Sequence, residues 1–166
     1  MAKRVRSLDP LIDENSRILI LGTMPGPESL RRKQYYANPG NQFWKIMYRV
    51  LGESNAPPSD YMERINFLKK NGVALWDVLE NCEREGASDS SIRNGKPNDF
   101  KTLLRQYPTL QRIFFNGKTA EYFFKKCASS ESALVQPAVL PSTSSANARM
   151  SADEKVRSWR GIKDFL

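Results

Sequence analysis

The sequence predicts an α/β fold: one domain built as a three-layer sandwich, with a small, mainly parallel four-stranded sheet flanked by helices. Its 166 residues fit a single domain of ordinary size. Four short, almost continuous apolar segments are typical of strands covered on both faces. Helical patterns separate these segments, and strands that alternate with helices favour a parallel sheet. We therefore expect residues 1–166 to form one domain, with residues 1–10 as a flexible N-terminal segment.

The expected strands are short and apolar. In the first, RILILG, every residue between the terminal Arg and Gly is aliphatic, and the third, RIFFN, contains two phenylalanines. Strands of this kind have no polar face to present to solvent. They are expected at residues 17–22, 73–78, 112–116 and 135–140.

Helices are expected where apolar residues recur every three or four positions. Phe43, Met47 and Val50 follow this spacing, and Ser151 stands where a capping box would begin the last helix. The helical patterns lie within residues 43–51, 61–68, 100–107, 120–127 and 151–162. Residues 83–98 are polar and contain two glycines and a proline, so we expect a long loop there.

The composition restricts the chemistry. There is no histidine, and Cys82 and Cys127 are the two cysteines, so the usual zinc, iron–sulfur and histidine-dependent sites lack their ligands or their base. We therefore expect no cofactor and no metal. Lys and Arg number 26 against 18 Asp and Glu, which gives a net charge of +8. This excess favours a polyanionic partner, although a solvated basic surface explains the charge equally well.

The sequence carries no sign of a membrane or export segment. It has no apolar run near the roughly 20 residues that a membrane-spanning helix needs. No apolar stretch follows the basic residues near the N-terminus. We therefore expect a cytoplasmic protein with no membrane partner.

The loops that follow the strands are the candidate sites, because parallel α/β sheets bind ligands beyond the carboxyl ends of their strands. The first loop, GTMPG at 22–26, contains two glycines, which allow backbone N–H groups to approach an anion or a carbonyl oxygen. It lacks the Lys-Ser/Thr pair of a P-loop. Plain turn residues would explain the two glycines equally well.

A second feature is the segment QYYANPGNQFW at 34–44. Tyr35 and Tyr36 supply aromatic rings, Asn41 and Gln42 supply amides, and basic residues precede them. Stacking, amide hydrogen bonds and positive charge are the means by which nucleic-acid bases are bound. The alternative is packing for the tyrosines and turn capping for Asn41.

Polar residues also end or follow the other strands. The segment LPSTSSANAR at 140–149 combines small residues, hydroxyls and Arg149, a composition able to contact phosphates, although Ser-rich turns are often without a ligand. Asn116 ends the third strand, where its amide could face a ligand or begin a turn. Asp77 and Asp89 are the two carboxylates considered near this site, and a capping role would explain Asp77 equally well.

These motifs, in this order, resemble the uracil-DNA glycosylase superfamily. The pattern G-x-x-P-G…Y-A-x-P-x-N-x-F-W, at 22–26 and 36–44, looks like the first motif of the mismatch-specific uracil/thymine glycosylases. Residues 140–149 resemble the second motif, a loop that penetrates the duplex. The resemblance spans most of the chain. QYYANPGNQFW, ALWDVLENCEREGASDSSI and LPSTSSANAR are most similar to the hypoxanthine-DNA glycosylase (DNA-deoxyinosine glycosylase) branch.

One position departs from the mismatch-specific pattern. Those members have a water-positioning Asn before the Pro-Gly of the first motif, and Met24 stands there instead. In the hypoxanthine branch, the resemblance gives this role to the Asn of P-x-N-x-F-W, here Asn41, acting through its side-chain carbonyl. The missing histidine also departs from uracil-specific members that use one in the second motif. The resemblance therefore implies excision of hypoxanthine, with weak or no activity on uracil.

The resemblance implies a uracil-DNA glycosylase-like fold and a monofunctional DNA glycosylase of base excision repair, which flips a deaminated base out of the duplex and hydrolyses its N-glycosidic bond. Asn41 is the expected catalytic residue. The expected base-binding residues are Thr23, Met24, Tyr36 and Asn116, with Tyr36 stacking on the base. The expected DNA-binding residues are Ser142, Thr143, Ser144, Ser145, Ala146, Asn147 and Arg149. The expected partner is double-stranded DNA with a damaged base, bound by a monomer.

Other function classes stay open on composition and spacing alone. They are a uracil or mismatch DNA glycosylase, a non-catalytic nucleic-acid-binding module, and a small-molecule enzyme that uses the glycine loop for a nucleotide. A binding module would leave no abasic site in DNA, and a nucleotide enzyme would be stabilised by nucleotides rather than by duplex DNA. The family resemblance favours the glycosylase.

Overall fold

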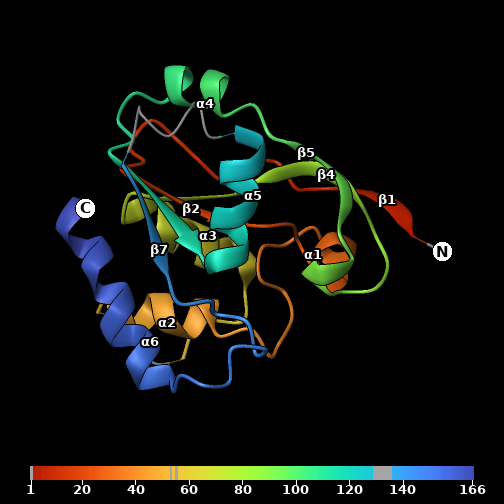
Figure 1. Ribbon diagram of the computed structural model, residues 1–166. Helices are drawn as coiled ribbons and strands as arrows, with labels where there is room; N and C mark the ends of the chain where they lie inside the picture. The colour runs from red at the N-terminus through yellow and green to blue at the C-terminus, as the bar shows by residue number, and fades with distance from the viewer. Residues whose placement is uncertain (1, 53, 55, 129–135) are drawn as a thin grey trace.

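A four-stranded parallel sheet lies at the centre of the computed structural model, which describes residues 2–52, 54, 56–128 and 136–166 (Figure 1). Its strands, in the order β3-β2-β6-β7, are β3 (Val73–Asp77), β2 (Ile18–Gly22), β6 (Arg112–Asn116) and β7 (Pro137–Leu140). All three pairings are parallel, so the four carboxyl ends meet at one edge. The predicted sheet is confirmed, with strand ends within two residues, although Val135 lies outside the described residues.

Both faces of this sheet are buried, because alternate residues of a strand point to opposite sides. Ile18 and Ile20 of β2 belong to one hydrophobic core, whereas Leu19 and Leu21 belong to the other. All four side chains are fully buried. The continuous apolar runs in the sequence therefore reflect a sheet covered on both sides.

Helices cover the two faces as separate layers (Figure 1). One layer consists of α2 (Phe43–Val50), α3 (Tyr61–Lys70) and α6 (Ala152–Trp159), and the other of α4 (Phe100–Gln106) and α5 (Lys118–Ala128). The 3-10 helix η3 (Arg160–Phe165) continues α6. The capping box of Ser151 and Glu154 begins α6 as predicted. Buried Trp159 packs edge-on against Phe43 and donates a hydrogen bond to the Pro141 carbonyl, which joins α6 to α2 and to the loop after β7.

A second sheet corrects two expectations. It contains β1 (Lys3–Arg6), β4 (Leu79–Arg84) and β5 (Arg93–Pro97), all antiparallel, with the 3-10 helix η1 (Asp89–Ser91) between β4 and β5. Residues 3–6 are thus a strand rather than part of a flexible segment, and residues 83–98 are largely structured rather than one long loop. The edge strands are charged and mostly exposed, with Arg4 paired to Glu83 and Arg6 paired to Glu80, so they lack the apolar signal of the central sheet.

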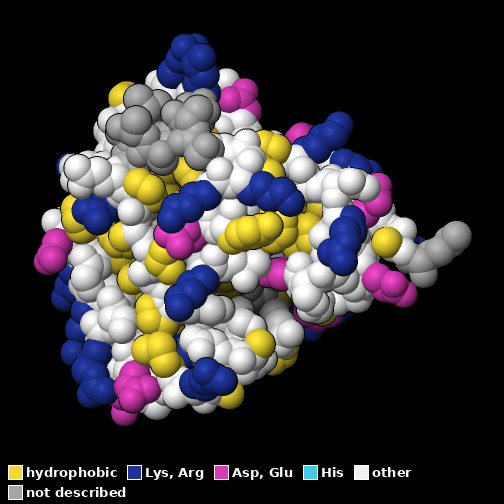
Figure 2. Space-filling model, viewed as in Figure 1, with side chains coloured by type: hydrophobic (Ala, Val, Ile, Leu, Met, Phe, Trp, Pro, Cys, Tyr) yellow, Lys and Arg dark blue, Asp and Glu magenta, His cyan; other side chains and the backbone are white. Residues whose placement is uncertain are grey.

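The surface is basic without a single basic tail. Lys and Arg side chains are distributed over the face shown in Figure 2. In the part of the chain that the structure describes, no helix is long and apolar enough to cross a membrane.

Candidate active site

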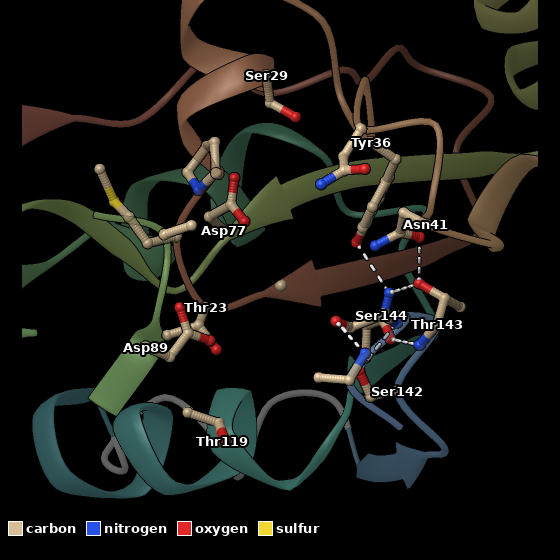
Figure 3. Close-up of a pocket in the computed structure, with 18 of the residues that line it drawn as sticks. Thr23, Ser29, Tyr36, Asn41, Asp77, Asp89, Thr119, Ser142, Thr143 and Ser144 are labelled. Atoms are coloured by element: carbon tan, nitrogen blue, oxygen red, sulfur yellow. Dashed lines mark hydrogen bonds between the residues drawn. The ribbon is translucent and has the colours of Figure 1, made fainter. Parts of the chain in front are cut away.

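A cavity of about 670 Å³ opens at the carboxyl edge of the parallel sheet, where the loops that follow the strands converge (Figure 3). It is lined by residues 22–29 and by Tyr35, Tyr36, Asn38, Asn41, Asp77, residues 87–90, Asn116, Thr119 and residues 142–146. The expected catalytic residue and all four expected base-binding residues are therefore in its wall. Of the expected DNA-binding residues, Asn147 and Arg149 are not.

Four side chains on one side of the cavity form a continuous hydrogen-bond network (Figure 3). The Thr143 hydroxyl donates to Asn41 Oδ1 across 2.8 Å. Asn116 Nδ2 donates to Thr143 Oγ1 at 2.9 Å and to the Tyr36 hydroxyl at 3.2 Å. The network therefore joins the loop before α2 to the ends of β6 and β7.

Two backbone amides fix the direction of every bond in this network. A backbone N–H can only donate, so the side-chain atom that it contacts must be an acceptor oxygen. The Phe43 N–H donates to Asn41 Oδ1 at 2.9 Å, and the Thr143 N–H donates to Asn116 Oδ1 at 2.9 Å. The amide nitrogens of Asn41 and Asn116 must then be the atoms on the other side of each side chain. The Tyr36 hydroxyl accepts from Asn116, so its own proton is left to donate.

This polarity changes the roles expected for the two asparagines. The carbonyl of Asn41 already accepts from Phe43 and Thr143, so it cannot also orient a water molecule, whereas its N–H2 group faces the hollow in Figure 3. Both N–H bonds of Asn116 are used by Tyr36 and Thr143. Asn116 therefore holds its neighbours in place instead of presenting free donors to a base. The free donors that face the cavity are the N–H2 group of Asn41 and the hydroxyl of Tyr36.

The two adjacent tyrosines have different surroundings. Tyr35 is buried, donates its hydroxyl to the Asp9 carbonyl at 2.6 Å and accepts at its own carbonyl from the Trp44 indole, as the packing interpretation requires. Tyr36 lies with its ring stacked on Phe43, with the ring centroids 4.0 Å apart. Its φ of 55° is in the left-handed region, where a non-glycine residue is strained. The backbone thus turns the Tyr36 hydroxyl into the cavity.

The glycine loop after β2 uses its carbonyl groups to bind β4 and the residue before it. The Gly22 and Thr23 carbonyls accept from the N–H groups of Val78 and Leu79, at 2.8 and 3.1 Å. The Pro25 carbonyl accepts from Arg84 Nη2 at 2.7 Å. The two glycines differ. A Cβ at Gly22 would lie 2.7 Å from Asp77 Oδ1, whereas a Cβ at Gly26 would meet nothing within 4 Å. Close approach therefore requires glycine at position 22 only.

Met24 is a residue of the cavity wall whose side chain also packs in the core. It is buried and belongs to the hydrophobic core that covers the α4 and α5 face.

Two carboxyl groups, those of Asp77 and Asp89, lie on the opposite side of the cavity (Figure 3). Asp77 is 5% exposed; its burial, with the negative charge of Asp89 adding and Arg84 opposing, raises its pKa to about 7. Burial also raises the pKa of Asp89, against the effects of Arg84 and of a hydrogen bond with Thr23. Arg84 is 4% exposed, and within the described residues its Nε and Nη1 atoms have no hydrogen-bond partner. Asp77 is therefore a carboxyl group poised to exchange a proton near neutral pH.

The model of the uracil DNA glycosylase superfamily matches residues 10–163 of the chain, which include every residue of this cavity. The chain belongs to the uracil DNA glycosylase superfamily. This confirms the resemblance of the motifs and the fold that it implies.

Two curated relatives of the chain have the same name. The chain is 38% identical over 157 residues to "Hypoxanthine DNA glycosylase" of Methanosarcina acetivorans, covering 95% of this chain and 96% of the relative. It is 43% identical over 114 residues to "Hypoxanthine DNA glycosylase" of Methanosarcina barkeri, covering 68% and 72%. A solution NMR structure from Methanosarcina acetivorans, described as a candidate uracil DNA glycosylase, is similar with a TM-score of 0.81 and 37% identity, covering 97% of this chain and 99% of that one.

The segment 142–149 is held by hydrogen bonds between its own residues. Ser142 Oγ accepts from the Ser144 N–H, Ser144 Oγ accepts from the Ala146 N–H, and Asn147 Nδ2 donates to the Ser142 carbonyl. Ser145, Ala146 and Arg149 are exposed. Thr143 is instead fully buried and its hydroxyl lies between Asn41 and Asn116, so it is not available to hold a phosphate as expected.

Two buried residues beside the cavity, Arg84 and Lys155, could not be identified as part of the site from the sequence. Arg84 ends β4 but lies inside the segment 83–98 that was expected to be a loop, so its burial under the glycine loop was not predictable. Lys155 is 1% exposed and donates to Gln42 Oε1 at 3.0 Å, which fixes the residue before α2 from the distant α6. No group of three or more His, Cys, Asp and Glu side chains among the described residues is arranged to hold a metal ion.

Proposed function

We propose that this chain is a monofunctional DNA glycosylase of base excision repair that hydrolyses the N-glycosidic bond of a flipped hypoxanthine in double-stranded DNA. We further propose weak or no activity on uracil. The observation that carries the proposal is the cavity-facing N–H2 of Asn41, in a chain whose relatives at 38% and 43% identity are named hypoxanthine DNA glycosylases.

The cavity suits the charge that develops when the base departs. Cleavage of an N-glycosidic bond leaves positive charge on the sugar and moves negative charge onto the base. The free donors on the network side, Asn41 Nδ2 and the Tyr36 hydroxyl, are held in place by Thr143 and Asn116 before any base arrives. A preorganised donor of this kind is typically worth about 3 kcal/mol in the transition state.

The role of Asn41 therefore differs from the one that the family pattern implies. Because its carbonyl already accepts two hydrogen bonds, Asn41 acts on the departing base and does not orient the attacking water. Water reaches the sugar through the open side of the cavity after the bond has stretched. The oxocarbenium-like sugar is reactive enough to capture a water molecule that is merely nearby.

Met24 supports the weak activity on uracil. The mismatch-specific pattern has a water-positioning Asn at this point, and here a thioether is packed into the core. The chain lacks that polar group at the sugar, so it relies on donors to the base.

The DNA contacts are assigned by exposure. Ser142, Ser144 and the exposed tip at Ser145, Ala146 and Arg149 contact phosphates and fill the gap left in the duplex, with Asn147 bracing the loop. The flipped base stacks against Tyr36, at an unstacking cost of a few kcal/mol that is lowest for a mispaired base. The protein acts as a monomer within the cell.

The test is an alkaline strand-cleavage assay on labelled duplexes that contain one deoxyinosine or one deoxyuridine. Wild type is compared with Asn41→Ala and with a matched control, Asn15→Ala, which removes an exposed amide outside the cavity. Cleavage at deoxyinosine, weak or absent cleavage at deoxyuridine, and a loss of about a hundredfold or more in Asn41→Ala alone are expected.

The other outcomes separate the alternatives. Strong cleavage at deoxyuridine would assign a uracil or mismatch glycosylase. Duplex binding without cleavage of either substrate would assign a non-catalytic module. Near-normal turnover by Asn41→Ala would remove Asn41 from the reaction.

A further inference from the structure

Asp77 is a buried carboxyl group that the reaction as described so far does not use. It ends β3 and lines the cavity, and in the described part of the chain no residue makes a hydrogen bond to its Oδ2 atom. Its Oδ1 atom occupies the space that a side chain at Gly22 would need, 2.7 Å from the position of a Cβ. The wall of the cavity thus contains a carboxyl group that packs closely against Gly22 and has a buried, unpartnered oxygen.

A proton on this oxygen has few acceptors around it. The carbonyls of Gly22, Thr23 and Pro25 each already accept one hydrogen bond, from Val78, Leu79 and Arg84. The Asn41 carbonyl on the far side of the cavity is occupied as well. A bound base would bring a further acceptor close to a protonated Asp77.

The charges that face Asp77 make the protonated form accessible. Asp89 is a negative neighbour, Arg84 is a positive one, and the Tyr35 and Tyr36 hydroxyls stay neutral because their own pKa values are raised by burial. Burial outweighs the guanidinium, so the neutral carboxylic acid is favoured up to neutral pH. A base that fills the cavity removes more water and strengthens this preference.

We propose that Asp77 is a second catalytic residue of the excision reaction, acting as the general acid that gives its proton to a ring nitrogen of the departing purine. The inference rests on the proposed function, since it needs a purine substrate. It also names a substrate class for the cavity: purine lesions, whose rings keep unprotonated nitrogens. Uracil offers a protonic acid only its carbonyl oxygens.

The step balances as a hydrolysis. The bond between the sugar C1′ and the base N9 breaks, and its electron pair goes to the base. The Asp77 proton moves to another ring nitrogen, so the base leaves neutral. Water adds to C1′ through its oxygen and releases one proton, which returns to the Asp77 carboxylate directly or through solvent. No oxidant, metal or further reactant is needed.

The test is the pH dependence of single-turnover hypoxanthine excision between about pH 5.5 and about pH 8.5. Wild type is compared with Asp77→Asn, which can donate a hydrogen bond but cannot transfer a proton. The matched control, Asp60→Asn, makes the same change at the N-cap of α3, where Asn caps as well as Asp. Thermal unfolding and duplex binding are measured for each variant.

We expect the wild-type rate to be high at low pH and to fall about tenfold per pH unit above about pH 7. Asp77→Asn should be slower by about a hundredfold or more at low pH and nearly independent of pH, while Asp60→Asn follows wild type. Asp89→Asn removes a negative charge that adds to the effect of burial on the Asp77 pKa, so it should move the fall to lower pH.

Three results would overturn the inference. A wild-type rate that rises with pH would make Asp77 a base. A flat wild-type profile would leave no titrating acid, and this reading does not depend on whether Asp77→Asn folds. Folded Asp77→Asn with a wild-type rate would remove Asp77 from the reaction. Absence of hypoxanthine excision by wild type at every pH would instead sink the proposed function itself.

Discussion

The hydroxyl of Thr143 donates to the side-chain carbonyl of Asn41 across 2.8 Å, although the two residues are 102 positions apart in the sequence. The same hydroxyl accepts a hydrogen bond from Asn116, so it bridges the side-chain amides of Asn41 and Asn116. Because Thr143 is fully buried, no solvent molecule can replace its hydroxyl in this bridge.

Replacing Thr143 with Val keeps the shape of the side chain and removes the hydroxyl that bridges Asn41 and Asn116. The orphaned donor and acceptor should lower the free energy of unfolding by about 1–3 kcal/mol. Hypoxanthine excision should fall by about tenfold or more, because Asn41 is no longer held. Urea unfolding and single-turnover assays measure the two effects. Thr143→Ser keeps the hydroxyl and should stay close to wild type; equal damage in both variants would mean that the methyl group, not the hydroxyl, is what matters.

The close approach of Asp77 to Gly22 predicts a strong effect of a single methyl group. In Gly22→Ala the new Cβ would lie 2.7 Å from Asp77 Oδ1, so the Asp77 carboxyl group must move. A loss of about 1–3 kcal/mol in stability and a clear drop in excision are expected. Gly26→Ala is the matched control, since a Cβ there meets nothing within 4 Å. Thermal unfolding of the pair decides the matter, and indistinguishable melting curves would contradict the prediction.

The raised pKa of Asp77 makes stability depend on pH. The folded carboxyl titrates at about 7 and its ordinary value is 3.8, so between these limits the folded protein keeps a proton that the unfolded chain has released. The unfolding free energy should therefore fall as pH rises through this window, by up to about 1.4 kcal/mol per pH unit from this group. Below the window the group contributes nothing, and above it the loss is complete.

Asp77→Asn removes this titration. The stability of the variant relative to wild type should rise between about pH 4 and about pH 7 and then level off. Denaturant unfolding of both proteins across this range gives the difference directly. A constant difference at all pH values would show that Asp77 does not bind a proton more tightly in the folded state.

Arg149 provides a test of the DNA-facing loop. It is exposed and lies beyond the cavity, so it should contribute to DNA affinity without contributing to catalysis. Arg149→Gln should weaken duplex binding uniformly across sequences and reduce the slope of log affinity against log salt by about one. Arg105→Gln on α4, outside the cavity wall, should leave that slope unchanged. Fluorescence anisotropy at several salt concentrations measures both, and identical slopes would place Arg149 away from the phosphates.

The sequence predicts the central sheet well, because its strands are buried on both sides. RILILG at 17–22 can hardly be anything but an interior strand, and β2 is found there. The antiparallel sheet is different. KRVR in β1 and RNGKP in β5 are mainly charged or polar, and they are strands because their backbones pair with β4. Pairing between distant segments leaves no periodic pattern in either one.

The same distinction applies to the site. That the loop after β2, Asn116 and the loop after β7 would converge follows from the rule that carboxyl ends of parallel strands share one edge. Tyr36 and Asn41 were expected there from the family resemblance. The direction of their hydrogen bonds does not follow, since it depends on where the Phe43 and Thr143 N–H groups point. For this reason the carbonyl of Asn41 was expected to act in the cavity, whereas in the structure the N–H2 group faces it.

Lys155 has a consequence for how the protein becomes active during synthesis. Its buried ammonium group holds Gln42, next to Asn41, from a helix near the C-terminus. A ribosome therefore releases the loop before α2 long before the residues that immobilise it. Because Gln42 and Lys155 lie 113 positions apart, the hydrogen bond that fixes the residue beside Asn41 forms only after α6 has been synthesised and has docked.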